Sequence, residues 1–301
     1  ASGTLGSGLP QCMLAKVLDP TGQIKNSKTL EQFGLLGKEV GTQLKADGNR
    51  MLIVVNSNGA IAFTRKGDLM NLQLRHILDE IGDSYVKQGF TEELILDGEA
   101  FAPISVMSFN ESNGLLKRFK GEISPKVKLI KYYIYDVMSS DSYKEREKVI
   151  DKFVSSNVIK VETNYLVATD VSLKKEMEKH IEDGFEGLII RQLDKPYENK
   201  RSNFLIKYKT KDSDEFKLLG MEEDARGGFV GAFVLEMKEP SIDANGKPIT
   251  TFKAGTTGMT QDELKKIWES QNKYVGTMCT VEFFELSEFS VPRFGKVKEL
   301  N

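Results

Sequence analysis

The sequence has 301 residues, of which 40% are hydrophobic and 29% are charged, and its formal net charge is −2. These values fit a globular protein of two domains or one large domain, and they exclude a mainly disordered chain. They also exclude nucleic-acid binding through net charge alone, although a local basic groove is compatible with them. Apolar runs fall well short of the roughly 20 residues of a membrane span, so we expect no membrane partner.

The first part of the chain predicts β-strands followed by an amphipathic helix. Residues 1–12 are rich in small residues, and we interpret them as a leader outside the fold. Residues 40–64 predict three strands separated by turns at 46–48 and 56–59, and the Asp-Gly pair of the first turn is typical of a hairpin. A helix is predicted over 68–88, and one face of it carries Leu72, Leu74, Ile77, Leu78 and Ile81.

Four more strands and two helices are predicted up to residue 210. Alternating or continuous apolar runs predict strands within 93–104, 126–138, 185–193 and 203–210. Helical periodicity predicts helices within 142–156 and 172–184, and the second would end at Gly184 as a C-terminal cap.

The pattern changes after a polar joint near residues 211–214. Several strands with one helix inserted at 260–271 follow, as is typical of a closed barrel of the OB type. We therefore predict an α+β protein with antiparallel sheets flanked by helices at 13–211 and an OB-fold β-barrel at 212–301. We expect it to be a monomer.

The few cysteines and histidines restrict the chemistry. Cys12 and Cys279 cannot form a four-thiolate zinc site, and the distant His76 and His180 make a histidine-based triad a poor candidate. Covalent chemistry would therefore have to come from lysine, aspartate or glutamate. Because two cysteines do not suggest a disulfide framework, we expect a cytoplasmic protein, or a periplasmic one if a signal peptide has been removed.

Charged side chains recur within or beside the apolar strands. The segment QLKADGNRM places Lys45, Asp47 and Arg50 between two apolar stretches, which taken alone is typical of a polar turn. Comparable positions are held by Arg65, Glu99, Glu186, Lys207 and Lys209. Because isolated buried charge is costly unless it is paired or bound, the whole set predicts a ligand site.

The same residues indicate the nature of the ligand. Lys207 and Lys209 lie two residues apart and hence on one face of their predicted strand. Two neighbouring lysines repel each other unless an anion lies between them, and the simplest such anion is a phosphate chain. Glu99 and Glu186 offer the hard oxygen ligands that Mg²⁺ prefers.

Five motifs occur in the order found in the covalent nucleotidyltransferases. They are Lys-x-Asp-Gly-x-Arg at 45–50, LDGEA at 96–100, YYIYDVM at 132–138, EGLIIR at 186–191 and IKYK at 206–209. Within that superfamily the sequence resembles the ATP-dependent DNA ligases. The segments QLKADGNR, SNGLLKRFKGEIS and YENKRSNFLIKYK are most similar to ligases of the T-even bacteriophages. The resemblance covers roughly residue 13 to the end and implies a nucleotidyltransferase (adenylation) domain before the OB-fold domain.

The resemblance implies that nicks with 5′-phosphate and 3′-hydroxyl ends are sealed in three steps. Lys45 would take AMP from ATP, the 5′-phosphate would accept it from the lysyl-AMP, and the 3′-hydroxyl would displace it. Lys207 and Lys209 would hold the α-phosphate and stabilise its transition state, and Arg50 would contact the ribose or the 5′-phosphate. The implied cofactors are ATP and Mg²⁺, which Mn²⁺ could replace, and the implied partner is nicked double-stranded DNA.

Further residues of the nucleotide site follow from the same resemblance. Gln43 would hydrogen-bond adenine, at a position where several relatives carry glutamate, and Leu44 would belong to the same site. Tyr135 would stack on adenine with Ile189 on the opposite ring face. Glu99 would meet the ribose or a metal, and Glu186 would hold the metal.

The implied DNA contacts are cationic. Arg65 would lie near the nucleotide and the nick phosphate. A basic patch at Lys117, Arg118 and Lys120 would neutralise duplex phosphates without reading sequence, which predicts that binding weakens steeply with salt. The alternative for this patch is an ordinary solvated face.

Two features depart from the family. Its last motif normally ends in Arg-x-Asp-Lys and orients pyrophosphate, whereas here Lys298, Leu300 and Asn301 occupy those positions. This difference leaves the efficiency of self-adenylation open, and Arg293, Lys296 or Lys298 could substitute in part. Larger relatives also carry a helical DNA-binding domain before the core, and we expect that domain to be absent here.

Three alternatives share these features. An RNA ligase or an mRNA-capping guanylyltransferase would use the same core, although EGLIIR and the segments similar to phage ligases favour DNA. The altered last motif would also suit an inactive nick-binding protein. A NAD⁺-dependent ligase is disfavoured because its four-cysteine zinc module is missing.

Overall fold

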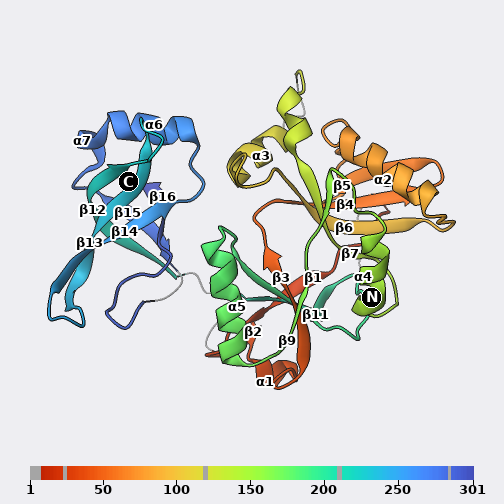
Figure 1. Ribbon diagram of the computed structural model, residues 1–301, viewed down its shortest axis with the longest axis horizontal. Helices are drawn as coiled ribbons and strands as arrows, with labels where there is room; N and C mark the ends of the chain where they lie inside the picture. The colour runs from red at the N-terminus through yellow and green to blue at the C-terminus, as the bar shows by residue number, and fades with distance from the viewer. Residues whose placement is uncertain (1–7, 23–25, 118–120, 209–211, 284–285) are drawn as a thin grey trace. The chain divides into compact units, whose positions relative to one another are not determined.

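The computed structural model describes residues 8–22, 26–117, 121–208, 212–283 and 286–301. The chain divides into two compact units, Ala1–Lys209 and Thr210–Asn301 (Figure 1). None of the helices within the described ranges is long and apolar enough to cross a membrane.

The first unit contains a six-stranded sheet with the strand order β2-β1-β11-β10-β3-β9. Its strands are β1 (Leu14–Leu18), β2 (Ser27–Lys28), β3 (Glu39–Lys45), β9 (Asn164–Val167), β10 (Gly187–Arg191) and β11 (Arg201–Tyr208). The pairs of β10 with β11, of β10 with β3 and of β3 with β9 are antiparallel, whereas β1 pairs in parallel with β11 and β2.

A second, five-stranded sheet in this unit has the order β5-β4-β6-β7-β8. Its strands are β4 (Asn49–Asn56), β5 (Gly59–Thr64), β6 (Leu94–Phe101), β7 (Lys131–Val137) and β8 (Val158–Lys160). Only the pair of β7 with β8 is parallel among these strands. Antiparallel pairing dominates both sheets, as predicted, but each is mixed because it has parallel strands at an edge.

The expected hairpin at residues 46–48 is wrong. Strand β3 pairs with β9 and β10, whereas β4 pairs with β5 and β6, so the chain passes from one sheet to the other between Lys45 and Asn49. The turn residues were identified correctly, but the strands on either side do not pair with each other. As a result, Lys45 and Arg50 belong to different sheets.

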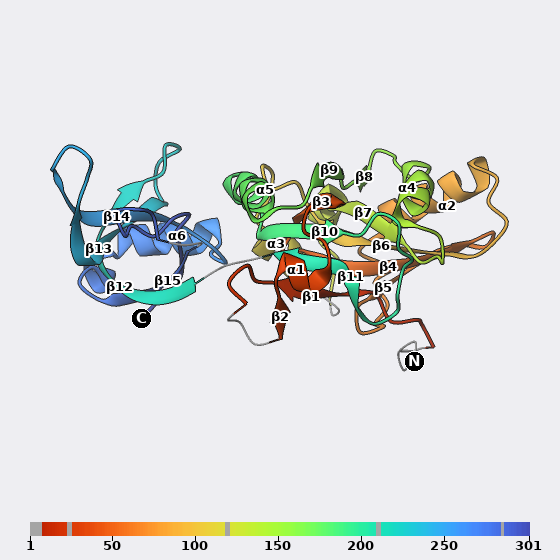
Figure 2. The same ribbon diagram turned by 90° about the horizontal axis from the view of Figure 1, so that it is seen from below.

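The helices of the first unit pack on the sheets (Figures 1 and 2). Helix α2 contacts β4 and β5, α4 contacts β7, and α5 contacts β10 and β3. The helices are α1 (Leu30–Phe33), α2 (Arg75–Lys87), α3 (Phe109–Leu116), the 3₁₀ helix η1 (Pro125–Leu129), α4 (Tyr143–Asp151) and α5 (Asp170–Glu182).

Two elements begin at least five residues after the start of their predicted ranges. Helix α2 begins seven residues later than predicted, at Arg75, and Leu72 lies outside it with 68% of its surface exposed. The other predicted face residues, Leu74, Ile77, Leu78 and Ile81, are buried. The predicted strand at 126–138 begins as the helix η1, because Ser124 accepts from the Lys126 N–H and Pro125 suits a first helical position.

Part of the segment interpreted as a leader belongs to the fold. Leu9 and Cys12 are buried and cluster with Leu52 of β4. The backbone oxygen of Gln11 also accepts a hydrogen bond from Asn199 Nδ2 at 2.8 Å. The leader interpretation is therefore wrong for residues 9–12, since two apolar side chains in this segment are sufficient to anchor it.

The second unit is a closed barrel with the strand order β12-β13-β14-β16-β15, as the OB prediction requires. Its elements are β12 (Asp212–Glu223), β13 (Val230–Ile242), β14 (Pro248–Thr256), α6 (Gln261–Glu269), α7 (Gln271–Tyr274), β15 (Met278–Phe283) and β16 (Lys296–Leu300). The inserted helix α6 starts with a reciprocal cap between Thr260 and Glu263.

The altered C-terminal motif forms the strand β16 of this barrel. Lys298 Nζ lies 3.3 Å from Glu282 Oε1, and Asn301 Nδ2 donates to Glu215 Oε2 at 2.9 Å. These residues therefore have structural partners within the barrel itself.

Candidate active site

A pocket of about 1080 Å³ lies within the first unit and is lined by residues of both sheets. All of the predicted site residues within the described ranges line it. They are Gln43, Leu44, Lys45, Arg50, Arg65, Glu99, Lys117, Tyr135, Glu186, Ile189 and Lys207. Arg118, Lys120 and Lys209 lie outside the described residues.

One wall of the pocket is built by three neighbouring strands of the six-stranded sheet. Ile189 of β10 is opposite both Gln43 of β3 and Lys207 of β11. Because side chains two residues apart lie on the same face of a strand, Lys45 shares the face of Gln43. Strand register thus brings together a glutamine and two lysines that are up to 164 positions apart.

The opposite wall comes from the five-stranded sheet. Arg50 of β4 is opposite Glu99 of β6, which is in turn opposite Tyr133 of β7. The β6–β7 register shifts between Asp97 and Gly98, so Tyr135 lies at a β-bulge, and its hydroxyl donates to Glu99 Oε1 at 3.2 Å. Bulges re-aim side chains in this way beside functional sites.

Gly48 allows the crossing chain to pass close to β6. A Cβ atom at this position would lie 2.8 Å from Phe101 Cδ1 and 3.1 Å from Glu99 Oε2. The segment between Lys45 and Arg50 therefore needs glycine at position 48, because a larger residue would collide with β6.

The amine of Lys45 donates a hydrogen bond to Glu186 Oε2 and forms an ion pair with it. Their side chains are 20% and 18% exposed, so both can be reached from the pocket. The Glu186 N–H also donates to the Lys45 carbonyl at 2.8 Å. These contacts hold the lysine at the end of β3 with its amine in the pocket.

Burial raises the pKa of the Glu99 carboxyl from its ordinary 4.5 to about 7, despite the opposing effect of Arg50 and Lys45. Within the described ranges, no group of three or more His, Cys, Asp or Glu side chains could hold a metal ion. Mg²⁺ commonly binds through one or two carboxylates together with substrate phosphates. Glu99 and Glu186 fit a cation of that kind and do not form a cage by themselves.

Replacing Glu99 with glutamine should weaken the pH dependence of stability. Because the folded chain holds this proton more tightly than the unfolded chain, the wild-type free energy of unfolding should fall as the pH rises from 4.5 to about 7. Glu99→Gln cannot titrate, so its stability relative to wild type should be higher at alkaline than at acidic pH. Urea unfolding on both sides of this range measures the effect, with the exposed Glu92→Gln as control. An unchanged slope in Glu99→Gln would contradict the prediction.

The side chain of Gln43 has protein partners at both ends of its amide. Its oxygen accepts from Arg191 Nε at 2.7 Å, and its nitrogen donates to the Tyr143 hydroxyl at 2.8 Å and to Thr163 Oγ1 at 3.0 Å. Both amide hydrogens are thereby used, so the adenine contact predicted for Gln43 would have to use its carbonyl oxygen or its backbone.

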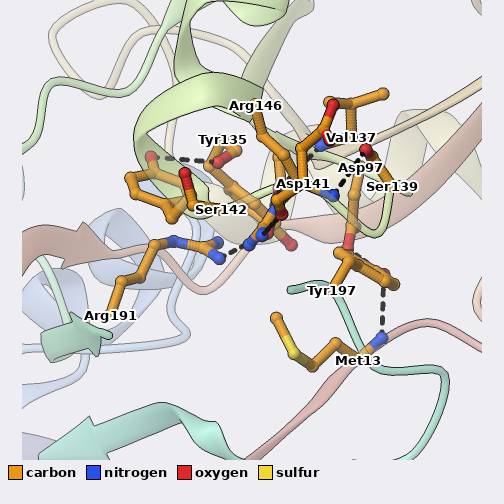
Figure 3. Close-up of polar contacts among 12 residues, drawn as sticks. Met13, Asp97, Tyr135, Val137, Ser139, Asp141, Ser142, Arg146, Arg191 and Tyr197 are labelled. Carbon is orange, nitrogen blue, oxygen red and sulfur yellow. Dashed lines mark hydrogen bonds and ion pairs between the residues drawn. The ribbon is translucent and has the colours of Figure 1, made fainter. Parts of the chain in front are cut away.

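A buried ion-pair cluster includes Arg191, which also lines the pocket and appears in Figure 3. Asp136 accepts from Arg146 Nε at 2.7 Å and from Arg191 NH1 at 2.6 Å, and the three side chains are at most 3% exposed. The Arg191 guanidinium also lies 5.4 Å from the centre of the Tyr135 ring. The ion pairs of Asp136 with the two arginines were not predicted, since nothing in the local sequence links positions 136, 146 and 191.

Exposed cations also line the pocket. Arg65 and Lys117 were predicted, and the structure adds Lys66 and Arg201 to the lining. Arg201 also donates from NH1 to the Ala15 carbonyl at 2.6 Å. The adjacent Lys200 and Arg201, where the charged connector meets β11, were the available signal for this position.

Comparison with known proteins finds DNA ligases. A "Probable DNA ligase" of Persephonella marina is 26% identical over 266 residues, covering 77% of this chain and 42% of that protein. The DNA ligase of Enterobacteria phage T4 is 28% identical over 220 residues, covering 68% and 43%, which confirms the expected likeness to T-even ligases. The chain thus spans about two fifths of the length of these curated relatives.

The fold is shared with solved ligase structures. The Chlorella virus DNA ligase-adenylate is 17% identical and superimposes over the full length of both chains with a TM-score of 0.55. The family model described as "ATP dependent DNA ligase domain" matches residues 12–209, which is most of the first unit and includes all of the pocket lining except Gln11. The chain therefore belongs to the ATP-dependent DNA ligase domain family.

Proposed function

We propose that the protein is an ATP-dependent DNA ligase that seals nicks through a lysyl-AMP at Lys45. The supporting observation is the position of Lys45, whose amine lies in a pocket with Lys207 and Ile189 on its own sheet and Arg50 and Glu99 on the other. A pocket of this size accommodates a nucleotide, and its cations match a phosphate chain.

The first chemical step of this proposal, adenylation of Lys45, uses residues of the pocket. The unprotonated Lys45 amine attacks the α-phosphorus of ATP and forms a P–N bond. The bond from that phosphorus to the oxygen shared with the β-phosphate breaks, pyrophosphate leaves, and the nitrogen loses one proton to solvent. Glu186 orients the amine before attack through their hydrogen bond. Lys207 lies beside Ile189 on the same wall as Lys45. Its positive charge would stabilise the negative charge that develops on the α-phosphate oxygens. Lys209, for which the same role is expected, lies outside the described residues.

The metal would be held by Glu186 and Glu99 together with phosphate oxygens, and Mg²⁺ would supply charge neutralisation there. Adenine would lie between Tyr135 and Ile189, which line the pocket from opposite sheets. Arg50 would contact the AMP or the 5′-phosphate that receives it.

The exposed cations that line the pocket would bind phosphates next to the nick. Arg65→Ala and Lys117→Ala should each weaken binding of nicked duplex and reduce the slope of log K against log salt by about one. Both residues are exposed and line the pocket. Lys148→Ala on α4, whose partner is the exposed Glu145, serves as the matched control. Fluorescence anisotropy over a salt series measures the slopes, and slopes equal to that of the control would contradict phosphate contact.

Radiolabelled nucleotides and two nicked substrates test the function. The protein should be labelled by ATP in preference to GTP, and it should seal nicked DNA in preference to nicked RNA. Preferential labelling by GTP would favour the capping guanylyltransferase, and preferential sealing of RNA would favour an RNA ligase. Absence of any adduct would favour the nick-binding protein, which the altered motif at Lys298 makes a specific alternative.

A further inference from the structure

Tyr197 joins three separate segments of the first unit through its hydroxyl group (Figure 3). The hydroxyl donates to Asp97 Oδ2 at 2.7 Å and accepts from the Met13 N–H at 2.8 Å. The tyrosine is 7% exposed and lies in the connector between β10 and β11. It therefore links the connector to β6 and to the residue that precedes β1.

The Asp97 carboxylate holds the guanidinium of Arg50. Arg50 donates from Nε to Oδ1 at 2.9 Å and from NH2 to Oδ2 at 2.6 Å, and the Asp97 side chain is fully buried. An arginine has five N–H groups. Those that Asp97 does not use can meet an incoming phosphate, which Arg50 can do only if its own position is fixed.

The hydroxyl of Tyr197 determines the orientation of that carboxylate. The terminal torsion of aspartate is broad and roughly two-fold, so hydrogen-bond partners decide where the carboxylate plane lies. Oδ2 accepts from both Tyr197 and Arg50. Loss of the hydroxyl would let the carboxylate rotate, and the bidentate Arg50 would move with it.

We propose that Tyr197 is a positioning residue for Arg50 in AMP transfer. This inference rests on the proposed function, because it assigns Arg50 a contact with the AMP or the 5′-phosphate. A displacement of about 1 Å in a positioned group can cost about a hundredfold in rate. A partial loss of orientation should therefore be measurable without unfolding the site.

The test compares Tyr197→Phe with Tyr85→Phe. Tyr85 of α2 is also buried, and its hydroxyl donates to the Glu92 carbonyl at 2.6 Å. Neither of these two residues lines the pocket. Single-turnover rates are measured for lysyl-AMP formation and for AMP transfer to a nicked duplex. Tyr197→Phe should slow at least one of these steps by about tenfold, which is about 1.4 kcal/mol, whereas Tyr85→Phe should slow neither.

A double-mutant cycle with Arg50→Lys separates positioning from general stability. Lysine keeps the charge but cannot form the bidentate contact, so Tyr197→Phe should have almost no further effect in that background. Equal slowing by Tyr197→Phe in both backgrounds would overturn the proposal, as would no slowing in the wild-type background while adduct formation is intact. Absence of lysyl-AMP in wild type would instead overturn the proposed function, and this inference with it.

Discussion

Replacing Lys45 with arginine should abolish the covalent AMP adduct and reduce sealing of nicked DNA by more than about 10⁴-fold, as removal of a nucleophile does in other enzymes. Arginine keeps the positive charge and can still pair with Glu186, so the ion pair is not simply deleted. Its guanidinium stays protonated and is not a nucleophile at neutral pH. Gel-based sealing assays and intact mass after ATP treatment measure the two effects.

A DNA substrate that already carries AMP on its 5′-phosphate serves as the control. Closure of this nick needs no attack by the lysine, so Lys45→Arg should close it far better than it seals an ordinary nick. An unchanged circular dichroism spectrum would show that the fold is retained. Adduct formation by Lys45→Arg would place the nucleophile at another residue.

Removing the Asp136 carboxylate should cause the largest loss of stability. Asp136→Ala would leave Arg146 and Arg191 buried without a carboxylate, and breaking a buried pair in this way costs about 3–5 kcal/mol. Native domains are stable by only about 5–15 kcal/mol, so much of the first unit's stability would be lost. Urea unfolding followed by circular dichroism measures this loss.

Two internal references make the experiment specific. Asp151→Ala, on the same helix as Arg146, removes a partner of Lys160 that is 53% exposed, and it should cost less than about 1 kcal/mol. Trp268 is the only tryptophan and lies in the second unit, so its fluorescence follows the barrel separately. Equal destabilisation by Asp136→Ala and Asp151→Ala would contradict the role of the buried cluster.

The sequence contained enough information to place the nucleotide-facing residues on strands. A strand was predicted from VGTQLK, which contains Gln43 and Lys45, and the structure has both in β3. The barrel and its helix α6 were likewise predictable from short strands and one strongly amphipathic segment. These features depend on local periodicity, which the sequence reports directly.

Long-range pairing could not be predicted in the same way. The Asp-Gly turn after Lys45 has the composition of a hairpin, yet β3 and β4 lie in different sheets, because turn residues do not specify which strands pair. The contacts of Asp97 with Tyr197 and of Asp136 with Arg191 join residues 100 and 55 positions apart. Helix α3 was also missed, since FNESNGLL has glycine and asparagines, which are weak helix formers.

Leu72 illustrates the limit of periodicity itself. It has the spacing of the apolar face of α2, but the helix begins three residues later and leaves it 68% exposed. No side chain caps the start of this helix at Leu74, so the sequence carried no signal for that boundary.

The central claim is that the Lys45 amine accepts the adenylyl group. The most direct measurement is peptide mapping by tandem mass spectrometry after incubation of the wild-type protein with ATP and Mg²⁺ or Mn²⁺. We expect a single AMP on the peptide that contains QLKADGNR, bound to Lys45. AMP on any other residue, or no AMP with either metal, would contradict the account.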